Sequence, residues 1–155
     1  MSERSQAPAR IEEFALQHPV RVRWAETDRQ GIVFNAHYLM YFDLAQTEHF
    51  RALDWRGANG FRRFGLDIFV VNANLDYRAS AAFDEMITLC ARVEHLGRTS
   101  LRYRMAVFRD EVLLVEGTIT YVVATREGRV PTPIPQEFVD RVMALERVPP
   151  ARKAG

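Results

Sequence analysis

Residues 20–53 read VRVRWAETDRQGIVFNAHYLMYFDLAQTEHFRAL, and this stretch decides the fold that we predict. Its first five residues, through Trp24, alternate between apolar and charged side chains, which is typical of a strand with one buried face. A polar turn follows and ends at Gly31, a residue that tolerates backbone angles that other residues avoid. Asn is a favoured residue at the start of a helix, so we predict a helix from Asn35 to about Leu53.

The first half of this predicted helix is apolar on nearly every side, from Tyr38 to Ala45. A helix without a polar face is normally buried, so the rest of the chain must surround it. The later sequence supplies strands for this purpose. We predict strands within residues 68–79, 86–97, 98–110 and 112–125.

The connecting segments complete the predicted topology. Residues 54–67 contain three glycines and are predicted as a loop with a short helical turn at residues 61–64. Three prolines between residues 131 and 135 exclude a central strand, and residues 136–146 have helical spacing. The predicted order is β-α-β-β-β-β-α, which is an antiparallel meander packed against one long helix, in the α+β class.

Length and composition indicate an ordinary globular protein. The chain has 155 residues, of which 48% are hydrophobic and 26% are charged. We predict one domain over residues 1–155, with a core at about 19–146 and loose tails at 1–10 and 148–155. Cys90 has no partner for an internal disulfide and is predicted to be a buried small apolar residue.

Several classes of partner and compartment are disfavoured. The net charge of +1 argues against a nucleic-acid surface. No apolar run approaches the roughly 20 residues of a membrane span. The N-terminal residues lack the apolar core of a signal peptide, so we expect a cytoplasmic protein. His49 and His95 show no metal-ligand spacing, and we predict no metal.

The turn between the first strand and the helix carries the candidate chemistry. Asp28 and Gly31 precede the predicted helix start at Asn35, where the first backbone N–H groups lack internal partners. Such N–H groups can stabilise an oxyanion, and a nearby Asp can act as a base or a nucleophile. The alternative is structural: Asp28 closes an Asx turn or caps the helix.

Residues 28–38, DRQGIVFNAHY, resemble the D-x-x-G-x-V-x-x-x-x-Y signature of hotdog-fold acyl-CoA thioesterases. The group is the 4-hydroxybenzoyl-CoA thioesterase type, with relatives encoded near the Tol–Pal envelope system. The resemblance spans about residues 19–142 and is sharp over residues 24–53. It implies a hotdog fold, in which a five-stranded antiparallel sheet curls around the helix. It also implies a homodimer or dimer of dimers with the active site between subunits.

The resemblance further implies roles for three residues at the turn. The carboxylate that matches Asp28 attacks the thioester carbonyl or activates the attacking water. The backbone N–H of Asn35 matches the oxyanion donor, and Gly31 permits the turn. Tol–Pal-associated relatives carry a catalytic His at the position of Asn35. Here His falls at His37, so that catalytic role is not transferred.

Other residues are candidates for substrate contact. Arg98 aligns with a basic turn that meets coenzyme A in relatives, with Arg129 a weaker candidate, and Asn72 falls in a region that lines the acyl pocket. His37 and Tyr38 are substrate-contact candidates, although both also suit a core or interface. Two carboxylates, Asp43 and Glu48, lie further along the helix, and Glu48 is the next candidate base if Asp28 is not the base.

We therefore predict an acyl-CoA thioesterase that uses no cofactor, because the thioester itself supplies the leaving group. One alternative is a thioesterase acting on acyl carrier protein, which would share the fold and the base. A second alternative is a non-catalytic hotdog module that binds acyl-CoA. The presence of Asp28 and Gly31 argues against this module, since binding alone does not need the carboxylate.

Overall fold

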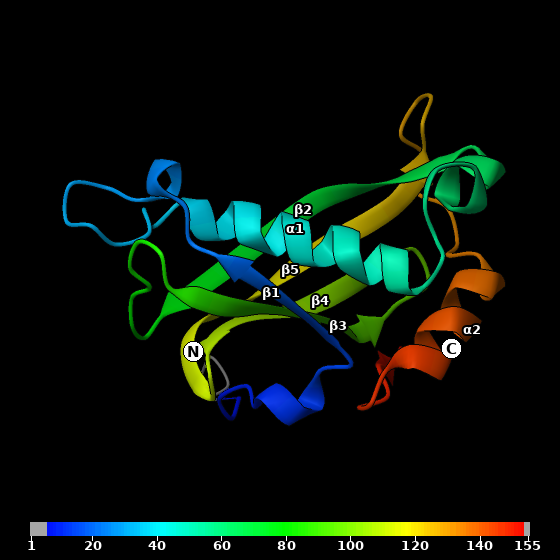
Figure 1. Cartoon of the computed structure of the whole chain (residues 1–155). Coiled ribbons are helices and arrows are strands. Elements are labelled where there is room, and N and C mark those ends of the chain that lie inside the picture. Colours follow the sequence, from blue (N-terminus) through cyan, green and yellow to red (C-terminus); the bar gives the residue numbers. More distant parts are fainter. Residues whose placement is uncertain (1–5, 154–155) are drawn as a thin grey trace, which may run out of the picture.

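The structure is a computed structural model that describes residues 6–153. A long helix, α1, lies across a curved antiparallel sheet (Figure 1). The elements in chain order are η1 (Ile11–Glu13), β1 (Leu16–Arg21), η2 (Trp24–Glu26), α1 (His37–Ala52), η3 (Gly57–Asn59), η4 (Phe61–Phe64), β2 (Leu66–Tyr77), β3 (Met86–Leu96), β4 (Ser100–Arg109), β5 (Val112–Thr125), α2 (Gln136–Leu145) and β6 (Ala151–Arg152).

Five long strands form one antiparallel sheet in the order β1-β3-β4-β5-β2. The predicted α+β arrangement, a curled antiparallel sheet against one long helix, is confirmed. The predicted meander holds only for β3, β4 and β5, because β2 crosses over to pair with β5 at the far edge of the sheet. The structure adds a short sixth strand, β6, which runs parallel to β3 on the edge that also carries β1. The prediction that residues 148–155 form a loose tail is therefore wrong for 151–152, and residues 154–155 lie outside the described part.

The inner face of the sheet holds α1 through a close approach at Gly117 of β5. Phe42 of α1 is 1% exposed. A Cβ atom on Gly117 would lie 3.1 Å from Phe42 Cε2 and only 1.9 Å from the backbone oxygen of Asn74 on β2. Glycine is thus the residue that lets β2, β5 and the helix come together at this point.

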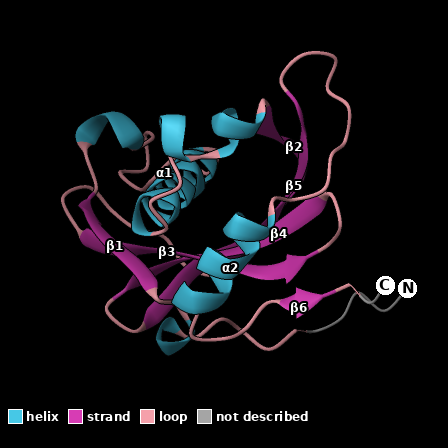
Figure 2. Cartoon of the chain, turned by 90° about the vertical axis from the view of Figure 1, so that its right-hand side faces the viewer, coloured by secondary structure: helices cyan, strands magenta, loops and turns pink. Residues whose placement is uncertain are grey.

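The outer face of the sheet is covered by the N-terminal segment, as Figure 2 shows from the end of the molecule. Ala9 and Phe14 are buried against Cys90, Ala106 and Phe108. The predicted burial of Cys90 is confirmed, and burial raises the pKa of its thiol to about 12. A loose tail at residues 1–10 is wrong for residues 6–10, whereas residues 1–5 lie outside the described part.

The far end of α1 is closed by aromatic side chains. The ring of Phe138 on α2 lies 5.0–5.9 Å from the rings of Phe50, Trp55 and Phe61. The predicted helical turn at residues 61–64 and the predicted C-terminal helix are both confirmed. Buried aromatic rings contribute large apolar areas, so this cluster anchors the loop after α1 to α2.

Two expectations about the first strand and the start of the helix are wrong. β1 ends at Arg21, and Trp24 begins the turn η2 with 75% of its surface exposed. The alternation of apolar and charged residues continues to Trp24 in the sequence, but the backbone leaves the sheet after Arg21. The residue that caps α1 is Ala36, without a side-chain hydrogen bond, and Asn35 lies in the preceding turn.

Burial of α1 and β2 also differs from expectation. Leu39 and Met40 are exposed, so α1 is covered on its sheet side and not all round. β2 is the edge strand, and residues 70–74 are exposed on both faces around a bulge at Val71. Within residues 6–153, no helix is long and apolar enough to cross a membrane.

We predict that Gly117→Ala lowers the free energy of unfolding by at least about 2 kcal/mol, because the new methyl group must displace the β2 backbone. Urea unfolding followed by circular dichroism measures this change. The matched control is Thr118→Ala, the next residue on β5, which we expect to alter stability far less. Equal stability of Gly117→Ala and the wild type would contradict the proposed close approach.

Candidate active site

Asp28 occupies a tight turn between η2 and α1. Its backbone N–H donates to Ile32 O at 2.9 Å, and the Gly31 N–H donates to Asp28 O at 3.0 Å. Gly31 has φ +77°, a left-handed conformation that favours glycine in a tight turn. Asp28 Oδ1 also accepts the Gln30 N–H at 2.8 Å, which is the Asx turn of the structural alternative.

The second carboxylate oxygen, Oδ2, makes no hydrogen bond within residues 6–153. Asp28 lines a pocket of about 530 Å³ together with Asn35 and Tyr38. Three of the residues singled out in the sequence therefore meet at one pocket. Its remaining lining residues are Gln30, Ile32, Val33, Tyr77, Arg78, Ala79 and Ser80.

Asn35 also lines this pocket. Its N–H has no hydrogen-bond partner in the described part of the chain, while its carbonyl oxygen accepts the Tyr77 hydroxyl at 2.8 Å. Tyr38 is buried beside it, and its hydroxyl oxygen accepts the Ala81 N–H at 3.3 Å. Burial raises the pKa of Tyr38, so this hydroxyl stays neutral at physiological pH.

The buried carboxylate of Glu26 joins the turn to the start of α1. It accepts hydrogen bonds from the Arg23 N–H at 2.8 Å, the Arg23 guanidinium at 2.9 Å and the Tyr41 hydroxyl at 2.9 Å. Its backbone oxygen accepts the Phe34 N–H at 2.9 Å. Burial alone would raise the pKa of Glu26, but the hydrogen bonds from Arg23 and Tyr41 lower it below the ordinary 4.5.

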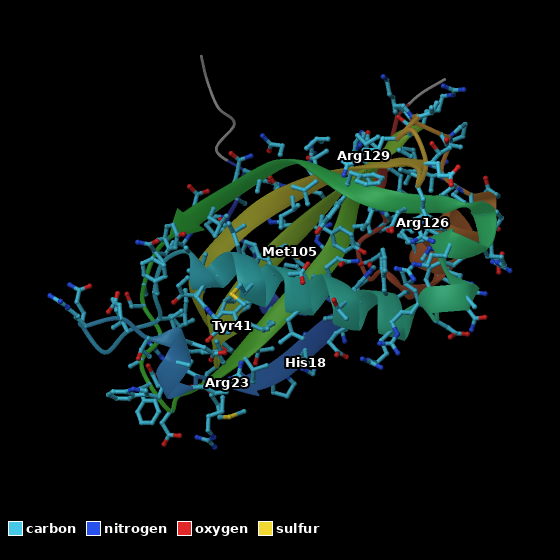
Figure 3. The ribbon with its side chains drawn as sticks, turned by 90° about the horizontal axis from the view of Figure 1, so that it is seen from above. His18, Arg23, Tyr41, Met105, Arg126 and Arg129 are labelled. Atoms are coloured by element: carbon cyan, nitrogen blue, oxygen red, sulfur yellow. The ribbon has the colours of Figure 1, made fainter. Side chains whose placement is uncertain are left out.

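His37 lies on the other side of α1 from the Asp28 pocket. Its Nε2 is 3.3 Å from Glu26 Oε2, and its ring packs edge-on against Tyr41 at 4.8 Å. With Arg23 and Met40 these residues line a second hollow of about 460 Å³. Figure 3 shows Arg23 and Tyr41 at this end of the molecule. His37 thus supports the turn and does not line the pocket of Asp28.

The remaining candidates lie away from the pocket within one subunit. Asn72 is in the exposed middle of β2, and Arg98 is in the turn between β3 and β4, at the opposite end of the sheet. Arg129 is also at the far end in Figure 3. Glu48, the alternative base, pairs with Arg51 at 3.1 Å on the helix surface and does not line this pocket.

Sequence reasoning missed Glu26, Tyr77 and Arg78. Glu26 carried a weak signal, since a carboxylate three residues after Arg23 suits a capping interaction with the Arg23 backbone. Tyr77 and Arg78 follow more than 40 residues after the turn, and only the register of β2 against β5 brings them to it. Within residues 6–153, no three His, Cys, Asp or Glu side chains cluster to hold a metal.

Comparisons with known proteins identify relatives of this chain. The family model of the thioesterase superfamily matches residues 30–116, which is more than half of the chain. "Acyl-CoA thioesterase YbgC" of Haemophilus influenzae is 25% identical over 119 residues, covering 77% of this chain and 88% of that protein. The family match begins two residues after Asp28 and extends through α1 to Glu116.

Solved structures share the same architecture. A thioesterase from Thermus thermophilus, crystallised with coenzyme A and Zn, is 27% identical with a TM-score of 0.76, covering 90% of this chain and 99% of that one. A Pseudomonas aeruginosa protein is 28% identical with a TM-score of 0.78, covering 88% and 95%.

We predict that Glu26→Gln lowers the free energy of unfolding at pH 7 by roughly 1–3 kcal/mol, because buried donors lose a charged acceptor. The pKa of Glu26 is lower in the folded protein than its ordinary 4.5. Ionised Glu26 therefore stabilises the fold above about pH 4.5, and this contribution is lost as the pH falls through the folded pKa.

Urea unfolding between pH 3 and pH 7 tests this prediction. Glu26→Gln should lose less stability on acidification than the wild type. Both proteins should still lose some stability as the pH falls, because the pKa of Glu116 is also lowered. The control is Glu111→Gln in the exposed turn after β4, which should follow the wild type. An acid dependence of Glu26→Gln identical to that of the wild type would count against the network.

Proposed function

The chain belongs to the thioesterase superfamily and is a thioester hydrolase, and we propose that it hydrolyses an acyl-CoA to coenzyme A and a free carboxylic acid. The observation that carries the proposal is that one pocket is lined by Asp28 and Asn35, which within residues 6–153 have a carboxylate oxygen and a backbone N–H without partners. The names of two relatives, one an acyl-CoA thioesterase and one a thioesterase crystallised with coenzyme A, support this substrate class.

In this proposal Asp28 carries the reaction. Its Oδ1 is held by the Gln30 N–H, which fixes the direction of the carboxylate, and its Oδ2 is left for the substrate. Oδ2 attacks the thioester carbonyl or removes a proton from the water that attacks it. Either route first forms a tetrahedral intermediate with a negatively charged oxygen on the former carbonyl carbon, and its collapse expels the thiolate of coenzyme A. In the nucleophilic route, water then hydrolyses the anhydride formed with Asp28, which releases the carboxylic acid and restores the carboxylate.

The backbone N–H of Asn35 stabilises the negatively charged oxygen of the tetrahedral intermediate. It precedes α1 by two residues, so it shares the partial positive charge at the start of the helix. Removing one donor of this kind typically costs on the order of 100–1,000-fold in rate. The hydrogen bond from the Tyr77 hydroxyl to the Asn35 carbonyl supports the orientation of this peptide.

We further propose that two copies pair through β2. Its outer edge has no strand partner within residues 6–153, and Val70 and Val71 are about 60% exposed beside it. An unpaired, apolar edge favours pairing with another strand. Two-fold antiparallel pairing would bring the start of one β2 to the end of the other. The Arg98 end of one subunit would then approach the Asp28 pocket of its partner.

We predict that Asp28→Asn reduces the rate of thiol release by on the order of 100-fold or more, because an amide cannot act as a base or a nucleophile. The assay uses a panel of aromatic and aliphatic acyl-CoAs with a thiol-reactive dye. Asp43→Asn, an exposed carboxylate on α1, is the control and should keep wild-type rates. Circular dichroism verifies that both variants are folded.

Other outcomes redirect the assignment. If folded Asp28→Asn keeps its activity, the base is misassigned, and Glu48 is tested next. If the wild type is inert on every acyl-CoA, acyl carrier protein thioesters are the next substrates. Binding of acyl-CoA without turnover of either substrate type would indicate a non-catalytic module.

A further inference from the structure

Arg78 stands at the border between the two faces of the sheet. It follows β2 directly and lines the Asp28 pocket. It also lines a hollow of about 480 Å³ on the outer face, together with Arg104 and Glu116. A cation in this position can contact a substrate that enters the pocket while its own support comes from the opposite face.

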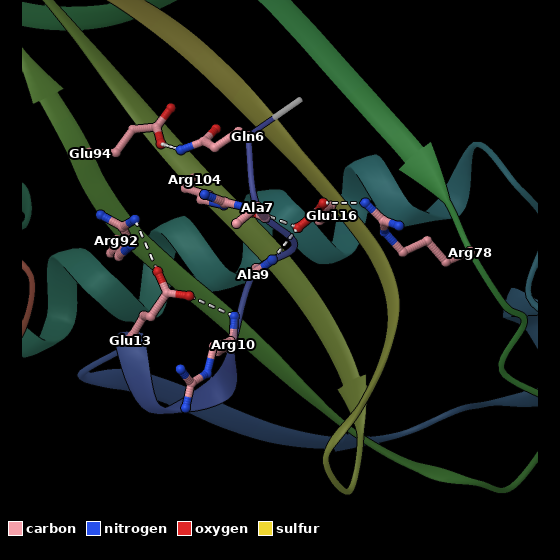
Figure 4. A network of polar contacts seen from close by, with 10 residues as sticks. All are labelled: Gln6, Ala7, Ala9, Arg10, Glu13, Arg78, Arg92, Glu94, Arg104 and Glu116. Atoms are coloured by element: carbon pink, nitrogen blue, oxygen red, sulfur yellow. Dashed lines mark hydrogen bonds and ion pairs between the residues drawn. The ribbon is translucent and has the colours of Figure 1, made fainter. Parts of the chain in front are cut away.

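Glu116 on β5 supplies that support (Figure 4). Arg78 Nη2 donates to Glu116 Oε1 at 2.8 Å, and Glu116 Oε2 accepts the Ala9 N–H at 2.8 Å and Arg104 Nη2 at 3.2 Å. The Glu116 side chain is 9% exposed. Its burial raises the pKa, but these three donors lower it below the ordinary value and keep the carboxylate ionised.

The backbone of Arg78 is fixed as firmly as its side chain. The N–H groups of Arg78 and Ala79 both donate to Leu114 O, at 2.8 and 3.0 Å. These two hydrogen bonds hold the segment after β2 on β5. They therefore fix the backbone position from which the Arg78 side chain extends. Because the attachment points are fixed at both ends, Arg78 loses little further conformational freedom when a ligand binds.

The guanidinium retains donors for an anion. Its bond to Glu116 is the only hydrogen bond that it makes within residues 6–153, and its side chain is 44% exposed. Glu116 must also serve Arg104, so one carboxylate balances two guanidinium groups. Asp76 lines the outer hollow nearby but is not bonded to Arg78 in the described part of the chain.

We infer that Arg78 binds a phosphate group of the coenzyme A portion of the substrate, and that Glu116 positions Arg78 for this contact. This inference rests on the proposed acyl-CoA hydrolysis. Guanidinium groups pair well with phosphates. Arg78 is half-exposed at the edge of the pocket, which suits the part of the substrate that stays outside. Within one subunit, Arg98 and Arg129 lie at the other end of the sheet.

The test compares hydrolysis of an acyl-CoA with that of the same acyl group on pantetheine, which carries no phosphate. Arg78→Gln should raise KM for the acyl-CoA roughly 10- to 100-fold, since hydrogen bonds to charged groups are worth roughly 1.5–3 kcal/mol. Its kcat, and both constants for acyl-pantetheine, should stay within about twofold of the wild type. Arg78→Lys should recover part of the loss.

Glu116→Gln tests the positioning role. It should raise KM for the acyl-CoA by a smaller factor than Arg78→Gln, and it should leave acyl-pantetheine unaffected. The matched control is Arg102→Gln, an arginine on the same face of the sheet that pairs with Glu94 at 2.7 Å and does not line the pocket. This control should match the wild type on both substrates.

Titration calorimetry with free coenzyme A separates this inference from the proposed hydrolysis. A wild type that turns over neither thioester but binds coenzyme A at least 10-fold more tightly than Arg78→Gln would contradict the hydrolysis and support the phosphate contact. Equal KM increases of Arg78→Gln on both substrates would overturn the contact and point to the acyl group. Unchanged KM and coenzyme A affinity in Arg78→Gln would also overturn it.

Discussion

The close approach of α1 to β5 at Gly117 is the constraint on which the rest of the structure depends. The ring of Phe42 occupies the space that a side chain at Gly117 would need, and the backbone of Asn74 closes it from β2. Protein cores are packed too densely to absorb such a displacement elsewhere. A side chain at Gly117 would therefore have to push α1 and β2 away from β5.

Glu116 and Gly117 are neighbours on β5 and face opposite sides of the sheet, as successive residues of a strand do. Gly117 lies against Phe42 of α1, and Tyr38 of this helix and Asn35 of the preceding turn line the pocket. Glu116 holds Arg78, which lines the same pocket from the segment after β2. Two neighbouring residues of β5 thus support the site, one from each face of the sheet. A one-residue shift in the pairing of β5 would turn each of them to the opposite face.

The part of the site that sequence reasoning found is the part built by local chemistry. Asp28 and Gly31 form a turn within a few residues, and the hotdog signature extends to Tyr38. The antiparallel pairing of β3, β4 and β5 also followed from their patterns and short connections, whereas the pairing of β2 with β5 did not. These features depend on residues close in the chain, where propensity and spacing are informative.

The errors concern features that depend on contacts between residues far apart in the chain. Trp24 continued an alternating pattern beyond β1, but the backbone turns at η2 and exposes it. Leu39 and Met40 extended the apolar surface of α1 beyond the side that the sheet covers. Arg78 reaches the site only through the pairing of β2 with β5. Such outcomes are decided by tertiary contacts, which a pattern in one segment does not contain.

Two carboxylates near the start of α1 differ in a way that bears on the chemistry. Glu26 accepts hydrogen bonds on both oxygens, from Arg23 and Tyr41, and is buried. A carboxylate in that state gains little by taking a proton, so it is a poor base. Asp28 has one oxygen held by Gln30 and one without a partner at the pocket. The hydrogen bonds on both oxygens of Glu26 hold the turn in place. The oxygen of Asp28 that lacks a partner in the described part of the chain can act as a base or a nucleophile.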